Sequence, residues 1–332
     1  MTAQKIIIDC DPGIDDALAL VFAHGHPGLT LGGITTVAGN VSLAATTENA
    51  LRVRDFVGMP AVPVTAGCPG PLLRPPLDAR HVHGSSGLGA ARLPAASAGP
   101  ANGHAVDYLA GAVGAEPGEI TLIAIGPLTN VALALRRYPR LVSQVRNFVI
   151  MGGSAGRGNT TPAAEFNIAA DPEAAAIVFG AGWPVTMVGL DVTRQARATA
   201  AVRGRMRGLG RLADELLLPG LSGYRGPGPA PGSGPADGPA VHDVCAVARV
   251  AAPELITCVP ARVEVETAGR WTAGMTVTDF TAAPGDANAQ VAVAIDVAGF
   301  WDVVLDAYGR AAAGMDITTG RVENCCATTE QY

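Results

Sequence analysis

The chain has 332 residues, of which 48% are hydrophobic and 16% are charged, and its formal net charge is −6. This composition excludes a globally disordered protein and predicts a sizeable buried core. The acidic balance gives no basic surface for nucleic acid, and no apolar run is long enough to span a membrane.

The chain opens with a predicted buried strand and an acidic turn. The β-branched run Ile6–Ile8 is too apolar for a strand with one wet face, which indicates a strand inside a parallel sheet. Pro12-Gly13 ends this strand, and an apolar helical pattern follows from Ala17 to Phe22. Four carboxylates therefore gather at one strand-to-helix turn: Asp9, Asp11, Asp15 and Asp16. Their repulsion would raise their pKa values, and a hard cation with oxygen ligands would relieve it.

Strands and helices then alternate, which is typical of an α/β protein with a mostly parallel sheet covered by helices on both faces. The predicted strands are Leu29–Val37, Ile120–Ile125, Asn147–Met151 and Pro184–Leu190. The predicted helices are Ser42–Val57, Ala105–Val113, Val131–Arg137 and one that starts at Asp171-Pro172-Glu173. Two loops separate them: Pro63–Gly87, which contains Arg80, His81 and His83, and the polar stretch Ser154–Asn167.

The second half of the chain is less regular. Pro219–Pro239 is so rich in proline and glycine that it predicts a flexible loop beside a functional site. His242-Asp243 then begin a helix over Val244–Ala251. Further predicted elements are an antiparallel hairpin of Arg262–Thr267 and Met275–Phe280, a strand at Gln290–Val297 and a last helix at Phe300–Tyr308. We therefore expect a single domain over residues 1–310 and a poorly ordered tail over 311–332.

Polar residues follow the predicted buried strands at the points where these strands end. They are the aspartates after Ile8, then Asn40, Thr129-Asn130, the stretch after Met151, and Asp191. In open α/β sheets, ligands bind outside the carboxyl ends of the strands. The pattern therefore predicts one site at that edge of the sheet.

The residue types at this edge suit a metal-assisted reaction. Asp11, Asp16 and the distant Asp243 can supply carboxylates to Ca²⁺, and the carbonyl of Ile125 at a strand end can complete the set. A water molecule that a metal holds beside a carboxylate is a nucleophile at neutral pH. His242 could act as a general acid. The alternative to a metal site is an acidic turn that is only a solvated loop or a helix cap. The alternative for His242 is a surface residue or a residue that only caps the helix.

Two other motifs fit the first turn less well. Asp9-x-Asp11 is similar to the nucleophile pair of haloacid-dehalogenase-type phosphatases, but that pattern has Thr or Val where this chain has Gly13. A dinucleotide-binding interpretation lacks a GxGxxG sequence after a strand.

Seven segments together resemble one family, the nucleoside hydrolases of the inosine-uridine preferring type. DCDPGIDDALAL at 9–20 resembles their DTDPGxDDAxAI fingerprint, with Cys10 in place of the usual threonine. The other segments are TTVAGN at 35–40, HGSSGLG at 83–89, AIGPLTNVAL at 124–133, VIMGGSAGRGNTTPAAEFNIAADPEAA at 149–175, GLDVTRQA at 189–196 and HDVCAVA at 242–248. The resemblance extends from Ile6 to about Tyr308. It implies a Rossmann-like nucleoside hydrolase fold and Ca²⁺-dependent cleavage of the N-glycosidic bond of ribonucleosides.

The resemblance also implies roles for individual residues. Asp11 matches the general base that deprotonates the metal-bound water, and the Ca²⁺ ligands match Asp11, Asp16, Asp243 and the carbonyl of Ile125. Asp15 matches the residue that binds the ribose 2′-hydroxyl, and Asn40 belongs to the same group of contacts. The residues that match those holding the 5′- and 3′-hydroxyls are Asn159, Glu165 and Asn167, and Met151 matches a residue that packs on the sugar. His242 matches the histidine implicated in protonating the leaving base. His83 and Phe166 are expected to border the base pocket and Tyr224 to close over it.

The expected protein is thus an N-glycosidase that releases ribose and free base from purine and pyrimidine ribonucleosides, for nucleoside salvage or catabolism. Two alternatives stay open: a hydrolase of a related ribosyl compound, such as a nicotinamide or modified riboside, and a non-catalytic nucleoside-binding protein of the same fold. We expect a homotetramer or homodimer with small-molecule substrates and no nucleic-acid or membrane partner. Six cysteines without a CxxC pair, and nothing resembling a signal peptide before the first strand, favour the cytoplasm.

Overall fold

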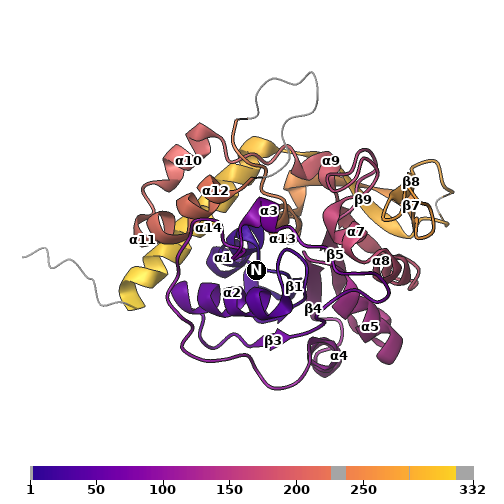
Figure 1. Cartoon of the computed structure of the whole chain (residues 1–332), viewed down its shortest axis with the longest axis horizontal. Coiled ribbons are helices and arrows are strands. Elements are labelled where there is room, and N and C mark those ends of the chain that lie inside the picture. Colours follow the sequence, from indigo (N-terminus) through magenta and orange to yellow (C-terminus); the bar gives the residue numbers. More distant parts are fainter. Residues whose placement is uncertain (1–2, 226–236, 284, 319–332) are drawn as a thin grey trace, which may run out of the picture.

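A computed structural model describes residues 3–225, 237–283 and 285–318 of the chain. In these residues nine strands form one sheet, in the order β3-β2-β1-β4-β5-β6-β9-β7-β8. The neighbours from β3 to β9 are parallel, whereas β9–β7 and β7–β8 are antiparallel. The prediction of a mostly parallel mixed sheet with an antiparallel hairpin in the second half is therefore confirmed (Figure 1).

The elements have the following bounds. The strands are β1 (Gln4–Cys10), β2 (Leu29–Thr36), β3 (Val64–Ala66), β4 (Ile120–Ala124), β5 (Asn147–Met151), β6 (Val185–Val188), β7 (Ile256–Val265), β8 (Thr276–Asp279) and β9 (Ala289–Ile295). The helices are α1 (Ile14–Gly25), α2 (Leu43–Phe56), α3 (Arg80–His83), α4 (Ala105–Ala115), α5 (Thr129–Arg137), α6 (Leu141–Gln144), α7 (Phe166–Ala170), α8 (Pro172–Phe179), α9 (Leu190–Thr193), α10 (Ala200–Met206), α11 (Gly210–Leu212), α12 (Leu218–Gly223), α13 (Asp243–Ala251) and α14 (Val297–Thr318). A π-helical turn, η1 (Ala213–Leu217), joins α11 to α12, and a 3-10 turn, η2 (Pro253–Leu255), precedes β7.

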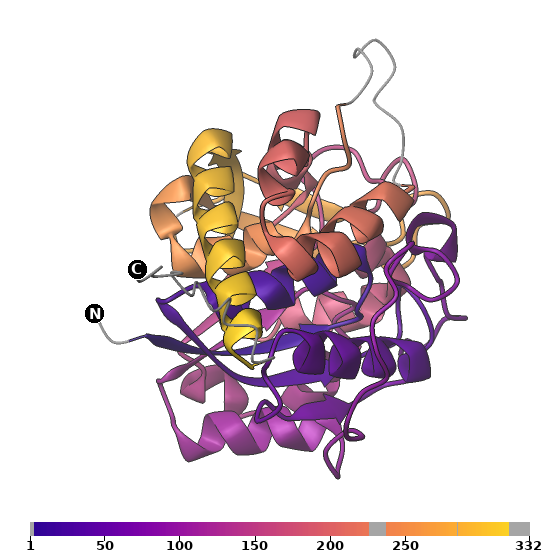
Figure 2. The ribbon, with the colours of Figure 1, turned by 90° about the vertical axis from the view of Figure 1, so that its left-hand side faces the viewer.

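Helices cover both faces of the sheet, which explains the apolar strands. In β1, Ile6 and Ile8 pack into one core cluster with side chains of α1, α2, α13 and α14. Ile7 points to the opposite face and packs with side chains of α4, α5 and α8. Since side chains alternate along a strand, a central strand needs apolar residues at every position to bury both faces. Figures 1 and 2 show these helices on the two sides of the sheet.

The strand order creates a crevice between β1 and β4. After β1 the chain moves outward through β2 and β3, and it then returns to place β4 on the other side of β1. The strands β3-β2-β1-β4-β5-β6 thus have the order of a doubly wound sheet. In such sheets, ligands bind at the carboxyl ends of the strands, at the point where the direction of winding reverses. Asp11 follows β1 and Ile125 follows β4, so both residues lie at this reversal.

The last helix is longer than the sequence predicts. It continues past Tyr308 to Thr318, so the prediction of a poorly ordered tail is wrong for residues 311–318. Glycines 309 and 314 weaken the helical pattern, but Ala311 and Met315 are buried in the core cluster that contains α1. Burial of this apolar face favours the helix despite its glycines. Residues 319–332, with Cys325-Cys326, lie outside the described part of the chain.

The predicted proline- and glycine-rich loop at 219–239 also contains regular structure. Its first residues, to Gly223, belong to α12, so the expectation of an irregular segment is wrong there. Pro219 lies in the first turn of α12, directly after the π-helical turn η1, and the backbone is helical at Leu217 and Leu218 on either side of that junction. Residues 226–236 of this stretch lie outside the described residues. In the other predicted loop, Pro63–Gly87, the chain forms β3 and α3.

Within the described residues no helix is both long and apolar enough to cross a membrane. Cys10, Cys68, Cys245 and Cys258 are free thiols, and the first three are buried.

Candidate active site

Three carboxylates from two helices meet at the crevice. Asp15 and Asp16 lie in the first turn of α1, and Asp243 is the first residue of α13. One oxygen atom from each lies within 4.8 Å of the others, and all three residues are buried. None of the ion pairs among the described residues involves these carboxylates, so they have no cationic side chain to offset their charge.

Asp11 lies beside this group and is held by the neighbouring strand end. Its Oδ2 accepts a hydrogen bond from the backbone N–H of Asn40 at 2.6 Å, whereas its Oδ1 is buried without a partner in the described structure. The carboxylate fits because Gly39 and Gly126 have no side chains. A Cβ on Gly126 would lie 2.7 Å from Asp11 Oδ1, and a Cβ on Gly39 would also overlap the carboxylate.

Asp16 is the best-satisfied carboxylate of the cluster. Its Oδ1 accepts from the backbone N–H of Asp11 at 3.1 Å, and its Oδ2 accepts from the N–H of Gly13 at 2.9 Å. The side-chain amide of Asn40 donates to Asp16 Oδ2 at 3.1 Å and to the carbonyl of Asp11 at 3.2 Å. Asn40 therefore connects Asp11 and Asp16 through both its backbone and its side chain.

A cation suits this cluster electrostatically. Burial raises the pKa of Asp11 well above its usual range, and the charge of Asp16 raises it further. Burial also raises the pKa of Asp243, with Asp15 and Asp16 adding to the shift, and it raises the pKa of Asp15 to about 7. Sequence reasoning attributed such shifts to repulsion, but removal from water is the larger cause. Buried oxygen ligands with an orphaned Asp11 Oδ1 and no cationic partner fit a hard cation such as Ca²⁺ or Mg²⁺.

Across the cavity, one amide connects the ends of β4 and β5. The side chain of Asn167 donates to the carbonyl of Ile125 at 2.9 Å and to that of Met151 at 3.1 Å. Glu165 caps the helix in which Asn167 lies, and its carboxylate accepts from the backbone N–H groups of Gly153, Asn167 and Ile168. Burial nevertheless raises the pKa of Glu165 to about 7. Asn159 lies in the preceding loop, where its side-chain oxygen accepts from the N–H of Phe166 at 2.9 Å.

The opposite end of the cavity has two histidines and a tyrosine. His83 ends α3, and its Nδ1 accepts from the backbone N–H of Ile14 at 3.1 Å. The Tyr224 ring meets that of His83 edge-on, with their centroids 5.4 Å apart. Burial lowers the pKa of His83 to about 3 and that of His242 to about 4, with Arg194 and Arg197 adding to the second shift. Both imidazoles are therefore neutral at neutral pH.

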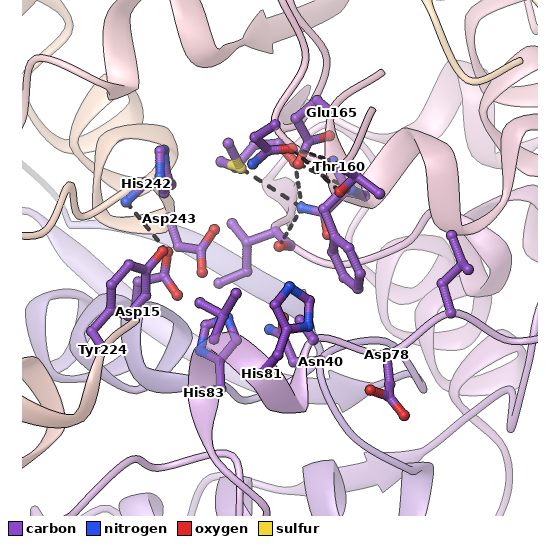
Figure 3. Close-up of a pocket in the computed structure, with 18 of the residues that line it drawn as sticks. Asp15, Asn40, Asp78, His81, His83, Thr160, Glu165, Tyr224, His242 and Asp243 are labelled. Carbon is purple, nitrogen blue, oxygen red and sulfur yellow. Dashed lines mark hydrogen bonds between the residues drawn. The ribbon is translucent and has the colours of Figure 1, made fainter. Parts of the chain in front are cut away.

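These residues surround one cavity of about 400 Å³, which is in the size range of small-molecule sites. The predicted residues in its lining are Asp15, Asn40, His83, Ile125, Met151, Asn159, Glu165, Phe166, Asn167, Tyr224, His242 and Asp243. Figure 3 shows Asp15, Asp243, His242 and Tyr224 at one end of the cavity, with Glu165 and Thr160 across from them. Asp11 and Asp16 do not line this cavity and are fully buried.

The structure adds to the predicted residues in two ways. Sequence analysis groups Asp11, Asp16 and Asp243 around an ion, and the family resemblance implies a sugar contact for Asp15. In the structure, the three carboxylates with oxygen atoms within 4.8 Å of one another are those of Asp15, Asp16 and Asp243. Sequence reasoning also missed lining residues on and around α3 and in the adjoining loops: Leu77, Asp78, Ala79, His81, Val82, Thr160 and Arg225. Several of these are close in sequence to His83 or Asn159, and that proximity was the available signal.

Two curated proteins are similar to this chain over nearly its whole length. The chain is 45% identical over 310 residues to an inosine-uridine preferring nucleoside hydrolase of Crithidia fasciculata. This match covers 92% of this chain and 98% of that protein. The chain is also 46% identical over 319 residues to the non-specific ribonucleoside hydrolase RihC of Salmonella newport. This match covers 94% of this chain and 100% of that protein.

Solved structures give the same result. A purine-preferring ribonucleoside hydrolase from Gardnerella vaginalis matches with a TM-score of 0.85 at 32% identity, over 95% of this chain and 100% of that one. An inosine-guanosine nucleoside hydrolase matches with a TM-score of 0.81 at 30% identity, over 92% of this chain and 98% of that one. The sequence pattern of the family described as inosine-uridine preferring nucleoside hydrolase covers residues 6–302. The chain therefore belongs to the inosine-uridine preferring nucleoside hydrolase family, and it is an N-glycosidase.

Proposed function

We propose that this enzyme is a Ca²⁺-dependent hydrolase of purine and pyrimidine ribonucleosides that releases ribose and a free base for nucleoside salvage or catabolism. The observation that supports this most directly is the buried carboxylate cluster. It forms no ion pair with a described cationic side chain, and it lies at a cavity whose lining also includes His83 and Tyr224. An uncompensated cluster of this kind is costly unless a cation completes it.

The proposed ion ligands are oxygen atoms of Asp11, Asp16 and Asp243 and the carbonyl of Ile125, with Asp15 as a further carboxylate of the cluster. A bound Ca²⁺ would orient a water molecule and lower its pKa. Asp11 Oδ1 accepts no hydrogen bond from any described residue, so Asp11 is the group that we propose as the general base. Its bond to Asn40 fixes the direction in which this oxygen points.

The remaining proposed roles belong to residues that line the cavity. We propose that the ribose hydroxyls bind to Asp15, Asn40, Asn159, Glu165 and Asn167, with Met151 against the sugar. Cleavage of a ribosyl bond passes through an oxocarbenium-like state, which nearby carboxylates stabilise. We propose that the base lies among His83, Phe166 and Tyr224. His242 would act as the acid by offering a hydrogen to the base atom on which negative charge develops.

A substrate panel tests the proposal. Purified enzyme loaded with Ca²⁺ is incubated with inosine, adenosine, uridine, cytidine and nicotinamide riboside, and the release of reducing sugar is measured. We expect turnover of both purine and pyrimidine ribonucleosides. Turnover of nicotinamide riboside alone would favour the related-riboside alternative, since the sugar contacts would be the same. Absence of ribose release from every compound would overturn the proposal.

Two broader expectations belong to the same proposal. We propose that the enzyme works as a homotetramer or homodimer, which agrees with the exposed apolar side chains of Trp271 and Phe280 near the β7–β8 edge. Light scattering coupled to size-exclusion chromatography measures this state directly. A cytoplasmic location agrees with the free thiols of the four described cysteines.

A further inference from the structure

We propose that Thr193 is a positioning residue for the reaction, because its hydroxyl fixes the His242 imidazole with its Nε2 hydrogen available to the departing base. This inference rests on the proposed role of His242. It names a residue outside the cavity lining that decides which ring nitrogen bears the hydrogen.

The two side chains are in direct contact. Thr193 Oγ1 lies 2.8 Å from His242 Nδ1, and Thr193 is fully buried as the last residue of α9. Among the described residues, Nδ1 is the only side-chain or backbone partner found for this hydroxyl. If the ring donated its own Nδ1 hydrogen, the buried hydroxyl hydrogen would have no acceptor, which is unfavourable. The hydroxyl therefore donates to Nδ1.

The position of the hydrogen on the ring follows from this direction. A neutral imidazole has one donor and one acceptor nitrogen, so an Nδ1 that accepts leaves the hydrogen on Nε2. His83 shows the same arrangement, because a backbone N–H, from Ile14, can only donate to its Nδ1. His83 and His242 thus both have their ring hydrogen on Nε2, the nitrogen that faces away from Ile14 N–H in His83 and from the Thr193 hydroxyl in His242.

A backbone bridge keeps Thr193 and His242 together although they are far apart in the sequence. The N–H of Val241 donates to the carbonyl of Ala196 at 2.9 Å, and the N–H of Ala198 donates to the carbonyl of Pro239 at 2.9 Å. Arg197 and Ala240 form the antiparallel bridge between these bonds. The backbone N–H of His242 also lies 3.4 Å from Asp15 Oδ2. The backbone is therefore placed without help from the Thr193 hydroxyl, whose remaining effect is on the ring.

Thr193→Val removes the hydroxyl and keeps the shape of the side chain. The ring can then place its hydrogen on either nitrogen, or rotate, so a smaller fraction of molecules presents Nε2–H to the base. Losing the hydrogen-bond partner that orients a metal-bound histidine typically costs about 10–100-fold in metal affinity or activity, and a loss of the same order is expected where the oriented histidine acts as an acid. We expect this loss in kcat/KM with inosine. Little change is expected with p-nitrophenyl riboside, whose leaving group departs without a proton.

The experiment compares four variants on these two substrates. His242→Ala sets the full size of the leaving-group effect, and Thr193→Ser should recover most of the inosine activity because it restores the hydroxyl. Thr47→Val is the matched control: it removes a buried hydroxyl whose one hydrogen bond among the described residues is to Thr36, and neither residue lines the cavity. Thr47→Val should not change the ratio of the two rates.

A spectroscopic measurement tests the tautomer separately from the rate. The ¹⁵N chemical shifts of His242, assigned by comparison with His242→Ala, should show Nε2–H in the wild type and a mixture of both tautomers in Thr193→Val. An unchanged tautomer in Thr193→Val, or equal slowing of both substrates, would overturn the inference. If His242→Ala itself leaves inosine hydrolysis unaffected, the fault lies in the proposed role of His242 and not in the contact with Thr193.

Discussion

The backbone N–H of Asn40 donates to Asp11 Oδ2 at 2.6 Å and leaves the other carboxylate oxygen of Asp11 buried and free of partners among the described residues. The strand end after β2 thus orients the carboxylate that follows β1. One oxygen is occupied by the scaffold, and the other remains for chemistry.

Asp11→Asn is expected to abolish most of the activity while preserving the fold. The amide keeps the shape of the side chain and can still accept from Asn40, but it cannot take up a proton from water. We expect kcat for inosine to fall by roughly 10²–10⁴-fold, the usual contribution of a general base. Steady-state kinetics at saturating Ca²⁺ measure this, with the thermal midpoint as a control for folding. A kcat within a few-fold of the wild type would exclude Asp11 as the base.

Removal of the metal or of one carboxylate should have the same effect on activity. Chelation should inactivate the wild type, and added Ca²⁺ should restore it. Asp16→Ala should lose both turnover and the rise in thermal midpoint that Ca²⁺ produces by binding the folded state. Because Asp16 also accepts bonds from Asp11 and Gly13, Asp243→Ala is made in parallel in case the first variant does not fold. Full turnover by rigorously metal-free enzyme would contradict the prediction.

2′-Deoxynucleosides should be poor substrates. Asp15 and Asn40 line the cavity as buried polar groups, and a missing 2′-hydroxyl would leave them unpaired. Sites built to bind a hydroxyl reject analogues that lack it by up to roughly 10⁴–10⁵-fold. The measurement is kcat/KM for uridine against deoxyuridine under identical conditions. Equal values would show that the proposed ribose contacts are misassigned.

The stability of the enzyme should depend on pH through Glu165. Its pKa is raised from 4.5 to about 7 by burial, so the folded protein holds this proton more tightly than the unfolded chain does. The stabilisation that this tighter proton binding gives the folded protein is fully present below about pH 4.5, and it is lost as the pH rises to about 7. Glu165→Gln cannot ionise, so its free energy of unfolding should fall less than that of the wild type across this window. Urea denaturation at several pH values tests this; parallel pH profiles for the two proteins would rule it out.

Local sequence was sufficient to predict the strands that are buried on both faces of the sheet and the elements that end at proline or glycine. The Ile6–Ile8 run, Pro12-Gly13 and the first-turn aspartates of α1 appear in the structure as the sequence predicts. The same reasoning failed where packing outweighs propensity. Gly309 and Gly314 weaken a helix, yet Ala311 and Met315 gain enough from burial to extend α14 to Thr318. Pro219 likewise indicates a break, but it occupies the first turn of α12.

The sequence by itself determined the fold class, the family and the edge of the sheet at which the site lies, because strand ends and buried runs are local features. Sequence analysis also grouped Asp243 with Asp11 and Asp16, but only the tertiary structure decided which of their oxygen atoms lie close together and which further side chains join them. Asp243 joins Asp15 and Asp16 across more than two hundred residues, and Thr193 meets His242 through a bridge between residues 196–198 and 239–241. These distances depend on how distant segments pack and pair, and no pattern within a single segment contains that information.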